Sequence, residues 1–387
     1  MSDRGVREAL AARSGTAPQD WFLVLKARSG LEVVFRVLRA VRGAGSVVTQ
    51  VFTCATAVDP VLVAGLVPRY AEVHADSLAL DPDRLDLPAD VRAVVVQHTF
   101  GMVDDAAALR LRDAAHAGGA VLVEDSAHAV TRLARAAGAP VADVSVHSFG
   151  AEKLLATKFG GAVWVRPDLD PAVRGPLVAA LAALPVPGLR HRWAMRCYRG
   201  QLRVLTRLPA AVAGPVRALA TRVGLHEPPV APVERTGRLA HPPLRPSRWV
   251  LGTMARALAW SGAVQARRAE TAAVYARELA DLDVPAGARG HAPLVRFPLY
   301  APDTAAAERV LAGLAAAGVP AGRWYRPALF PGPTDPALYA YRPGEVPTTE
   351  DLIARVVNLP TTVAPVEAER IAGLVRGLID PGARPGT

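Results

Sequence analysis

The stretch Val-Glu-Asp-Ser-Ala-His, residues 123–128, closes one apolar run of the sequence, and Ser-Phe-Gly-Ala-Glu-Lys, residues 148–153, closes the next. Continuous apolar runs of this length are typical of strands that are covered on both faces. Segments with helical spacing separate such runs, and strand–helix alternation predicts an α/β fold with a mostly parallel sheet. Because the carboxyl ends of parallel strands meet at one edge, we expect Asp125, Ser148 and Lys153 to lie together there.

The pattern along the chain predicts three regions. Residues 1–169 form a large α/β domain, residues 170–243 an arginine-rich helical excursion that ends in a Pro-rich linker, and residues 244–387 a smaller α+β domain. Strands are expected at Ser46–Val51, Pro68–His74, Arg92–Thr99, Ala120–Val123, Val141–Phe149, Gly161–Val165 and Leu294–Tyr300. Helices are expected at Leu31–Val41, Thr56–Gly65, Asp104–Ala117, Arg190–Leu208, Pro215–Leu225, Arg248–Ser261, Val264–Leu282, Asp303–Ala317, Thr348–Val356 and Pro365–Ile379.

The composition excludes several classes of protein. With 387 residues, 51% of them hydrophobic, the chain is long enough for a large and a smaller domain and is not disordered. Two cysteines, Cys54 and Cys197, exclude a disulfide scaffold and a cysteine-built zinc site, and we expect no metal. Residues 1–15 lack the apolar run of a signal peptide, and Pro176–Leu189 is too short to span a membrane. These features predict a cytoplasmic protein.

The net charge of +10 suggests an anionic partner, but the composition weakens that inference. Only three of the 45 basic residues are lysines, and an excess of arginine is as typical of a GC-rich genome as of a selected basic surface. We therefore expect no nucleic acid partner. Residues 190–248 hold twelve arginines and two acids. This favours a solvated helical face, with docking to a membrane, a carrier protein or a phosphate-bearing ligand as the alternative.

An acid at one strand end, with a serine and a lysine at the next, matches the needs of a pyridoxal phosphate site. The amine of Lys153 would bond to the aldehyde of the cofactor, and Asp125 would keep the pyridine nitrogen protonated so that the ring accepts electrons. The hydroxyl of Ser148 would hold the phosphate, and Gly160–Gly161 permits close backbone approach. Ala-Arg-Ser-Gly, residues 27–30, opens a predicted helix, where N–H groups and the helix dipole favour an anion.

These segments resemble the DegT/DnrJ/EryC1/StrS family of aminotransferases. The resemblance runs from about Ala27 to Val165 and resumes at Trp-Tyr-Arg-Pro, residues 324–327, and Val-Asn-Leu-Pro, residues 357–360. It implies the fold type I architecture, with a mostly parallel seven-stranded sheet in a large domain flanked by helices and a smaller α+β domain after it. It also implies pyridoxal 5'-phosphate as the cofactor and a homodimer with composite active sites.

The resemblance assigns roles residue by residue. Lys153 matches the lysine that binds the cofactor, Asp125 the acid on the pyridine nitrogen, and His128 the residue beside the phenolic oxygen, so these three are the expected catalytic residues. The expected cofactor contacts are Ser29, Gly30, Leu31, Thr53, Cys54, His98 and Ser148.

The remaining candidates are weighed from the residues themselves. Lys158 is the rival to Lys153 as the cofactor lysine, and Lys26 is expected at the surface. His147 is expected on the opposite face of its strand from Ser148, because neighbouring strand residues alternate. Arg323, Tyr325 and Arg326 are equally consistent with a substrate contact and with a loop surface. Glu32 is expected to point outward, away from a bound phosphate.

The sequence departs from the family pattern at several positions. Cys54 stands where an aromatic residue usually stacks on the ring, and Leu31 where a threonine commonly binds the phosphate. Lys158 and Phe159 stand where many members have an acid before the glycine pair. The Gly-Tyr-Asn segment that reaches the partner's phosphate is absent, and Arg245 or Arg248 is its possible substitute.

The resemblance implies an aminotransferase that moves an amino group from an amino acid, by analogy L-glutamate, to a keto acceptor, by analogy a nucleotide-linked keto sugar in secondary-metabolite or glycan biosynthesis. Two alternatives remain open. The first keeps the cofactor but performs elimination or decarboxylation on an amino acid, as the departures at Cys54 and at the missing Gly-Tyr-Asn segment allow. The second is a binding or regulatory protein with the family's shape, against which the intact Lys153 and Asp125 count.

Overall fold

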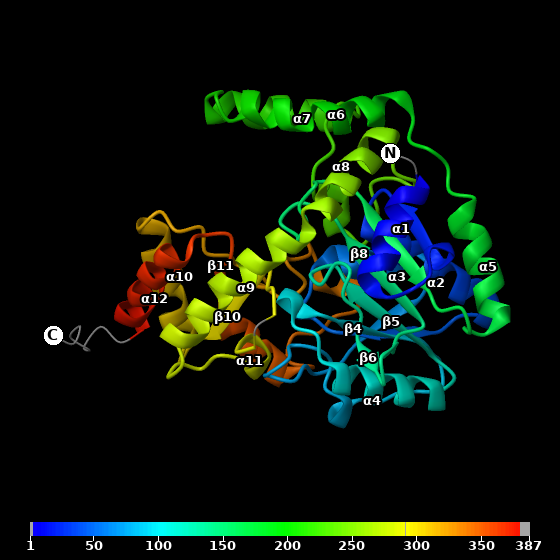
Figure 1. The fold of residues 1–387 in the computed structure, drawn as a ribbon, viewed down its shortest axis with the longest axis horizontal. Coiled ribbons are helices and arrows are strands. Elements are labelled where there is room, and N and C mark those ends of the chain that lie inside the picture. Colours follow the sequence, from blue (N-terminus) through cyan, green and yellow to red (C-terminus); the bar gives the residue numbers. More distant parts are fainter. Residues whose placement is uncertain (1–2, 291, 380–387) are drawn as a thin grey trace.

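The computed structural model describes residues 3–290 and 292–379, and a seven-stranded sheet lies at its centre (Figure 1). Its strands, in sheet order, are β1 (Trp21–Val24), β9 (Gly161–Val165), β8 (Val144–Ser148), β5 (Val121–Ser126), β4 (Val91–Gln97), β2 (Ser46–Thr49) and β3 (Val67–Tyr70). The five strands from β8 to β3 are parallel, whereas β9 is antiparallel to both β8 and β1. The predicted α/β fold with a mostly parallel sheet is confirmed.

Alternate residues of the central strands pack against helices on opposite faces of the sheet. Val95 and Val123 belong to a core shared with α2, and Val94 and Leu122 to a core shared with α4. These cores explain why the strands read as continuous apolar runs. The helices of this part of the chain are α1 (Asp3–Ser14), α2 (Ala27–Arg42), α3 (Ala55–Val63), α4 (Asp105–Ala117) and α5 (Pro171–Ala182).

The expected strands and helices of the first 165 residues lie within a few residues of those observed. The helix expected at Leu31–Val41 begins earlier, at Ala27, and its buried face includes Leu31, Val34, Phe35 and Leu38 at helical spacing. The sequence reading missed α1, β1 and α5. Strand β1 has only four residues and pairs with β9, which follows it by more than a hundred residues, so no local pattern marks it.

The register of the parallel strands brings their carboxyl ends to one edge. Gln97 at the end of β4 lies beside Asp125 of β5, and Ser126 lies beside His147 of β8. The loops that follow these three strands therefore start from neighbouring points, and Ser148 is the last residue of β8. This edge holds the candidate site.

The later part of the chain packs around a two-stranded antiparallel sheet. Its strands are β10 (Arg296–Tyr300) and β11 (Val356–Pro360), and its helices are α9 (Ser261–Glu278), α10 (Thr304–Ala316), α11 (Pro347–Arg355) and α12 (Pro365–Ile379). Helix α8 (Arg248–Ala259) packs instead on α1, with Val6 and Leu10 in one core with Val250 and Met254. The domain boundaries given above stay a prediction.

The arginine-rich excursion forms α6 (Leu189–Leu205) and α7 (Ala210–Arg222), which run along the upper edge of the molecule in Figure 1. Helix α7 extends away from the large sheet, above the later part of the chain (Figure 1). In residues 3–290 and 292–379, no helix is both long and apolar enough to cross a membrane.

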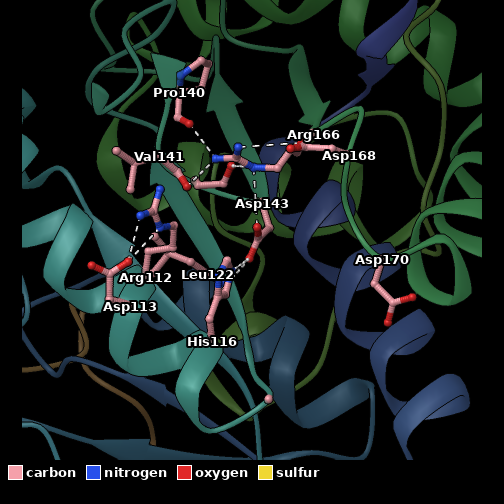
Figure 2. A network of polar contacts seen from close by, with 12 residues as sticks. Arg112, Asp113, His116, Leu122, Pro140, Val141, Asp143, Arg166, Asp168 and Asp170 are labelled. Atoms are coloured by element: carbon pink, nitrogen blue, oxygen red, sulfur yellow. Dashed lines mark hydrogen bonds and ion pairs between the residues drawn. The ribbon is translucent and has the colours of Figure 1, made fainter. Parts of the chain in front are cut away.

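A polar network ties together the strand ends opposite the site (Figure 2). Asp143, just before β8, accepts a hydrogen bond from the Leu122 N–H of β5 at 2.8 Å and pairs with His116 of α4 at 2.9 Å. Arg166, just after β9, lies 3.5 Å from the same carboxylate and donates to the Ala142 carbonyl at 3.0 Å. The carboxylates of Asp143 and Asp168 offset the charge of Arg166, and the carbonyl accepts one of its N–H groups, so this network has a structural role.

Candidate active site

A cavity of about 300 Å³ lies at the carboxyl ends of β4, β5 and β8. Its wall combines these strand ends with the start of α2, one residue of α6, and a loop of the later part of the chain. All three lysines of the chain, Lys26, Lys153 and Lys158, line this one cavity. The predicted residues that line it are Leu31, Thr53, Cys54, Asp125, His128, Ser148 and Lys153.

Lys153 and His128 form the central contact of the cavity. Lys153 Nζ lies 2.9 Å from His128 Nε2, and His128 Nδ1 accepts a hydrogen bond from the Phe100 N–H at 3.1 Å. Because Nδ1 accepts, the neutral ring carries its proton on Nε2 and donates it toward the amine, which must then offer a lone pair. This contact therefore favours the neutral, nucleophilic form of the Lys153 amine over the ammonium form.

Burial shifts both groups in the direction that this hydrogen bond requires. Desolvation lowers the pKa of Lys153, and the nearby Cys54 and Asp125 oppose the shift only in part. Desolvation also lowers the pKa of His128 well below its ordinary value, and the neighbouring Lys153 charge adds to the effect. Both groups are thus neutral over a wider pH range than in water.

Asp125 supplies the buried acid of the cavity. It is the fifth residue of β5, and its Oδ1 accepts a hydrogen bond from the Ala127 N–H at 2.9 Å. Burial raises the pKa of the carboxyl, while the Ala127 N–H and the Lys153 charge favour the ionised form. A buried carboxylate of this kind gains most from a protonated nitrogen placed against it.

Aromatic rings close the side of the cavity next to Lys153. The ring of Trp324 stacks on His128 at a centroid distance of 5.0 Å, and Lys153 Nζ lies 5.2 Å from the Trp324 ring centroid. The Tyr325 hydroxyl lies 3.2 Å from His128 Nε2, and burial raises the pKa of Tyr325 well above its ordinary value. Tyr325 therefore stays a neutral phenol, and the reading of this residue as a mere loop surface is corrected.

The start of α2 reaches the cavity through residues other than those expected. Ala27 and Arg28 line the cavity, whereas Ser29 and Gly30 are buried behind it. A Cβ on Gly30 would lie 2.5 Å from Val163 Cγ2 of β9, so this glycine permits close packing of α2 on the sheet. The role of Ser29 and Gly30 as direct phosphate contacts is not supported by these positions, while Ser148 and Leu31 do line the cavity.

Thr53 and Cys54 also line the cavity. Thr53 Oγ1 donates to Gln97 Oε1, and the Gln97 amide in turn donates to the Thr99 hydroxyl at 2.8 Å. Cys54 precedes α3 and lies 3.0 Å from the Thr56 hydroxyl. Gln97 lines the cavity and was not among the predicted site residues.

His98 does not line the cavity, in contrast to its expected role as a cofactor contact. The ring is fully buried and its Nε2 lies 2.7 Å from Glu124 Oε1, which also accepts a hydrogen bond from the Ala134 N–H. The strand alternation that sends Asp125 toward the cavity sends Glu124 to the other side. His98 lies on that same side of the sheet, next to Glu124. His147, expected to be structural, is buried against Ser145 and Thr131.

A strap of residues 226–231, which follows α7, covers the start of α2. Its Glu227 forms a buried ion pair with Lys26, and its Pro229 carbonyl accepts a hydrogen bond from Arg28 Nη2 at 2.8 Å. Lys26 is thus buried, and its expected surface position is wrong. Glu32 is also buried, where it pairs with Arg36 at 2.8 Å.

Sequence reasoning missed several residues of the wall, among them Arg28, Gln97, Tyr198 and Trp324. Arg28 and Trp324 stood inside quoted motifs, so their motif position was the available signal. Tyr198 comes from the excursion, where no local pattern indicates a cavity. Arg323 and Arg326 both pair with Glu308, at 2.8 and 2.7 Å, and do not line the cavity.

The residues present fit pyridoxal phosphate. A lysine amine with a lowered pKa and a buried carboxylate share one cavity with the hydroxyls of Thr53 and Ser148 and a helix N-terminus, which is the donor set that an aldehyde, a pyridine nitrogen and a phosphate require. With the seven-stranded sheet, this arrangement defines the class of fold type I pyridoxal-phosphate enzymes. The chain belongs to the DegT/DnrJ/EryC1/StrS aminotransferase family, which matches residues 5–174 and 256–376. The cofactor of this family is pyridoxal 5'-phosphate.

Comparisons with individual proteins agree with this membership. The spore coat polysaccharide biosynthesis protein SpsC of Bacillus subtilis is 31% identical over 161 residues, which cover 41% of this chain and 37% of that protein. The aminotransferase TlmJ from Streptoalloteichus hindustanus superposes with a TM-score of 0.67 at 22% identity, over 98% of this chain and 91% of that one. DesI, solved in the presence of its TDP-sugar product, superposes with a TM-score of 0.67 at 24% identity, over 97% and 84%.

Proposed function

We propose that this chain transfers an amino group from L-glutamate to the keto group of a nucleotide-linked sugar. The observation that carries the proposal is the contact of Lys153 Nζ with His128 Nε2 at 2.9 Å, in one cavity with the buried Asp125. The family supports amino transfer. The TDP-sugar product of DesI and the polysaccharide role in the name of SpsC support a sugar acceptor.

Bound pyridoxal phosphate supplies an electron-accepting ring beside the carbon that carries the amino group. Lys153 Nζ would bind the cofactor, and in its free neutral form the same atom would take the proton from that carbon and deliver it to the cofactor carbon that the lysine had occupied. The Asp125 carboxylate holds a proton on the ring nitrogen. Thr53, Ser148 and the start of α2 bind and orient the remaining polar groups of the cofactor, and Trp324 excludes water from the side of Lys153.

His128 positions the amine through a fixed tautomer. The Phe100 N–H occupies Nδ1, so Nε2 is the atom that donates toward Lys153 or toward an oxygen that replaces it. We also propose, from the family resemblance, that the chain acts as a homodimer with composite sites. A native mass equal to that of one chain would contradict the dimer.

The visible absorption of the purified protein tests the proposed role of Lys153. The wild-type protein with pyridoxal phosphate is expected to show the visible band of the lysine-bound cofactor, and L-glutamate is expected to bleach it to the ultraviolet band of the aminated form. Lys153→Ala should lose the lysine-bound band and lose turnover.

The matched control is Lys158→Gly, because Lys158 lines the same cavity with a φ of 82° that glycine adopts without strain. This variant should keep the band and its response to glutamate. A band that survives Lys153→Ala and disappears in Lys158→Gly would assign the cofactor to the other lysine. A band that ignores every amino donor would favour elimination or decarboxylation instead.

A further inference from the structure

The excursion carries an unneutralised positive charge. From residue 171 to residue 226 the sequence contains nine arginines and no aspartate or glutamate. Eight of these arginines, Arg190, Arg192, Arg196, Arg199, Arg203, Arg207, Arg217 and Arg222, are exposed, and within the described residues none of them forms an ion pair. The family match leaves out residues 175–255, so family membership does not account for this charge.

The same segment exposes a stripe of apolar side chains. On α7 these are Val212, Val216 and Leu219, and Val223 directly follows the helix; the four side chains are 42–63% exposed. At about 100° per residue they fall within roughly 60° of one another on the helix. Among the described side chains of α7 none is buried, so the described residues leave its apolar face largely uncovered.

Helix α6 continues this surface and anchors it to the body. Its inner face is buried through Ala194, Met195 and Tyr198, of which the last two belong to the core that also contains α1 and α8. Its outer face exposes Leu189 at 77% and Trp193 at 49%. We call residues 186–225 the basic ridge, because in Figure 1 its two helices project along one edge of the molecule.

Exposed apolar side chains with arginines beside them, here joined by the exposed Trp193 of α6, are typical of helices that lie in the interface of an anionic bilayer. On α7 the stripe runs between Arg217 and Arg222, which point to opposite sides of it at helical spacing. We propose that the basic ridge docks this protein onto the surface of a bilayer that contains anionic phospholipids. The apolar side chains enter the headgroup region while the arginines pair with phosphates.

The charge of the basic ridge favours an anionic bilayer over a second copy of the chain as its binding partner. A two-fold contact through the ridge would oppose eight exposed arginines to the same eight arginines, with no acid of residues 171–226 to neutralise them. An anionic bilayer instead supplies the opposite charge over the whole length of the ridge. The ridge is a projecting surface rather than a groove, which suits a shallow insertion.

Co-flotation of the full-length protein with vesicles tests the proposal. The protein is expected to float with vesicles of phosphatidylcholine and phosphatidylglycerol, to stay behind with phosphatidylcholine alone, and to detach as salt is raised. Arg217→Gln with Arg222→Gln should weaken the partition roughly fivefold per arginine. Val216→Ser with Leu219→Ser should also weaken it, because the apolar contribution is lost.

Matched controls change the same chemistry elsewhere on the surface. Arg39→Gln with Arg309→Gln removes two exposed arginines of α2 and α10, and Leu338→Ser with Val366→Ser removes two exposed apolar side chains. Both controls should float like the wild-type protein, and the visible cofactor band of every variant reports that it is folded.

Three results would overturn the proposal. The first is a failure of the wild-type protein to float with anionic vesicles, and the second is an equal loss in the controls and the ridge variants. The third is a native mass that falls when the ridge is altered, which would make the ridge a contact between copies. None of these depends on the proposed reaction, because flotation is measured without substrate.

Discussion

At the scale of single residues, the hydrogen bonding in the site depends on which ring nitrogen of His128 accepts a hydrogen bond. The Phe100 N–H fixes Nδ1 as the acceptor, and this leaves Nε2 to face Lys153. Because the donor is a backbone N–H, every change of side chain at residue 100 except one to proline leaves it in place, so the course of the chain after β4 sets the tautomer. The same trace places Phe100 within 6.3 Å of the His128 ring centroid.

Gly30 offers a residue-scale test of what the start of α2 requires. An added Cβ would lie 2.5 Å from Val163 Cγ2, so Gly30→Ala must push α2 away from β9. We expect the free energy of unfolding, measured by urea denaturation, to fall by about 1–3 kcal/mol despite the better helix propensity of alanine. Adding Val163→Ala makes room for the new methyl group, and the double variant should then lose less than the sum of the two single changes. Additive losses would contradict the close packing.

Local sequence motifs predicted much of the site because its principal residues lie where strands end. Asp125, Ser148 and Lys153 follow apolar runs, so the parallel sheet alone predicted their proximity. The prediction failed at His98, whose environment is set by the buried Glu124 across the sheet. Motif position could not distinguish a side chain that faces the cavity from one that faces the opposite side. The contribution of Tyr198 depends on how the excursion folds back, which no pattern near residue 198 encodes.

At the scale of elements, the strap holds the start of α2 by charge. Burial raises the pKa of Glu227, but the hydrogen bond with His241 and the charge of Lys26 outweigh it and lower the pKa to about 2. The second acid of this region, Glu234, pairs with Arg28 at 2.5 Å. Both acids lie in the linker that ends the excursion, after α7, so ion pairs join this linker to the start of α2.

The lowered pKa of Glu227 predicts a loss of stability in acid. Because the folded-state pKa of about 2 lies below the unfolded value of 4.5, the contribution is present above pH 4.5 and is lost as the pH falls toward 2. Its size is on the order of 3 kcal/mol. In urea denaturation at about pH 6, Glu227→Gln should therefore be less stable than the wild-type protein, and the difference should shrink toward about pH 3. A difference that is constant with pH would show that the carboxylate charge is not what holds the strap.

At the scale of the whole molecule, the cavity joins distant parts of the chain. Its wall contains strand ends of the large sheet, Tyr198 of α6, the strap, and Trp324 and Tyr325 of the later part. A ligand that fills it therefore contacts all of these parts at once. The sequence predicted the α/β class from its alternating pattern, but the way these parts meet rests on contacts between residues more than a hundred positions apart.

Pyridoxal phosphate should accordingly stabilise the whole fold. At a free concentration one hundred times its dissociation constant, a ligand that binds only the folded state adds about 2.7 kcal/mol to the free energy of unfolding. We expect a corresponding rise in the thermal midpoint of the wild-type protein. Lys153→Ala should show a smaller rise, because the bond to the lysine is lost. Equal rises in both proteins would indicate that the lysine contributes nothing to cofactor binding.

The three lysines of the chain also have a practical consequence, since all of them line one cavity. On most proteins, reagents that label primary amines, such as activated esters or formaldehyde with a mild reductant, react with many surface lysines. On this protein their side-chain targets are confined to the cavity wall, where Lys26 is already occupied by Glu227. The extent of amine labelling should thus report whether the cavity is occupied. Amine-reactive cross-linkers should react very little with the outer surface.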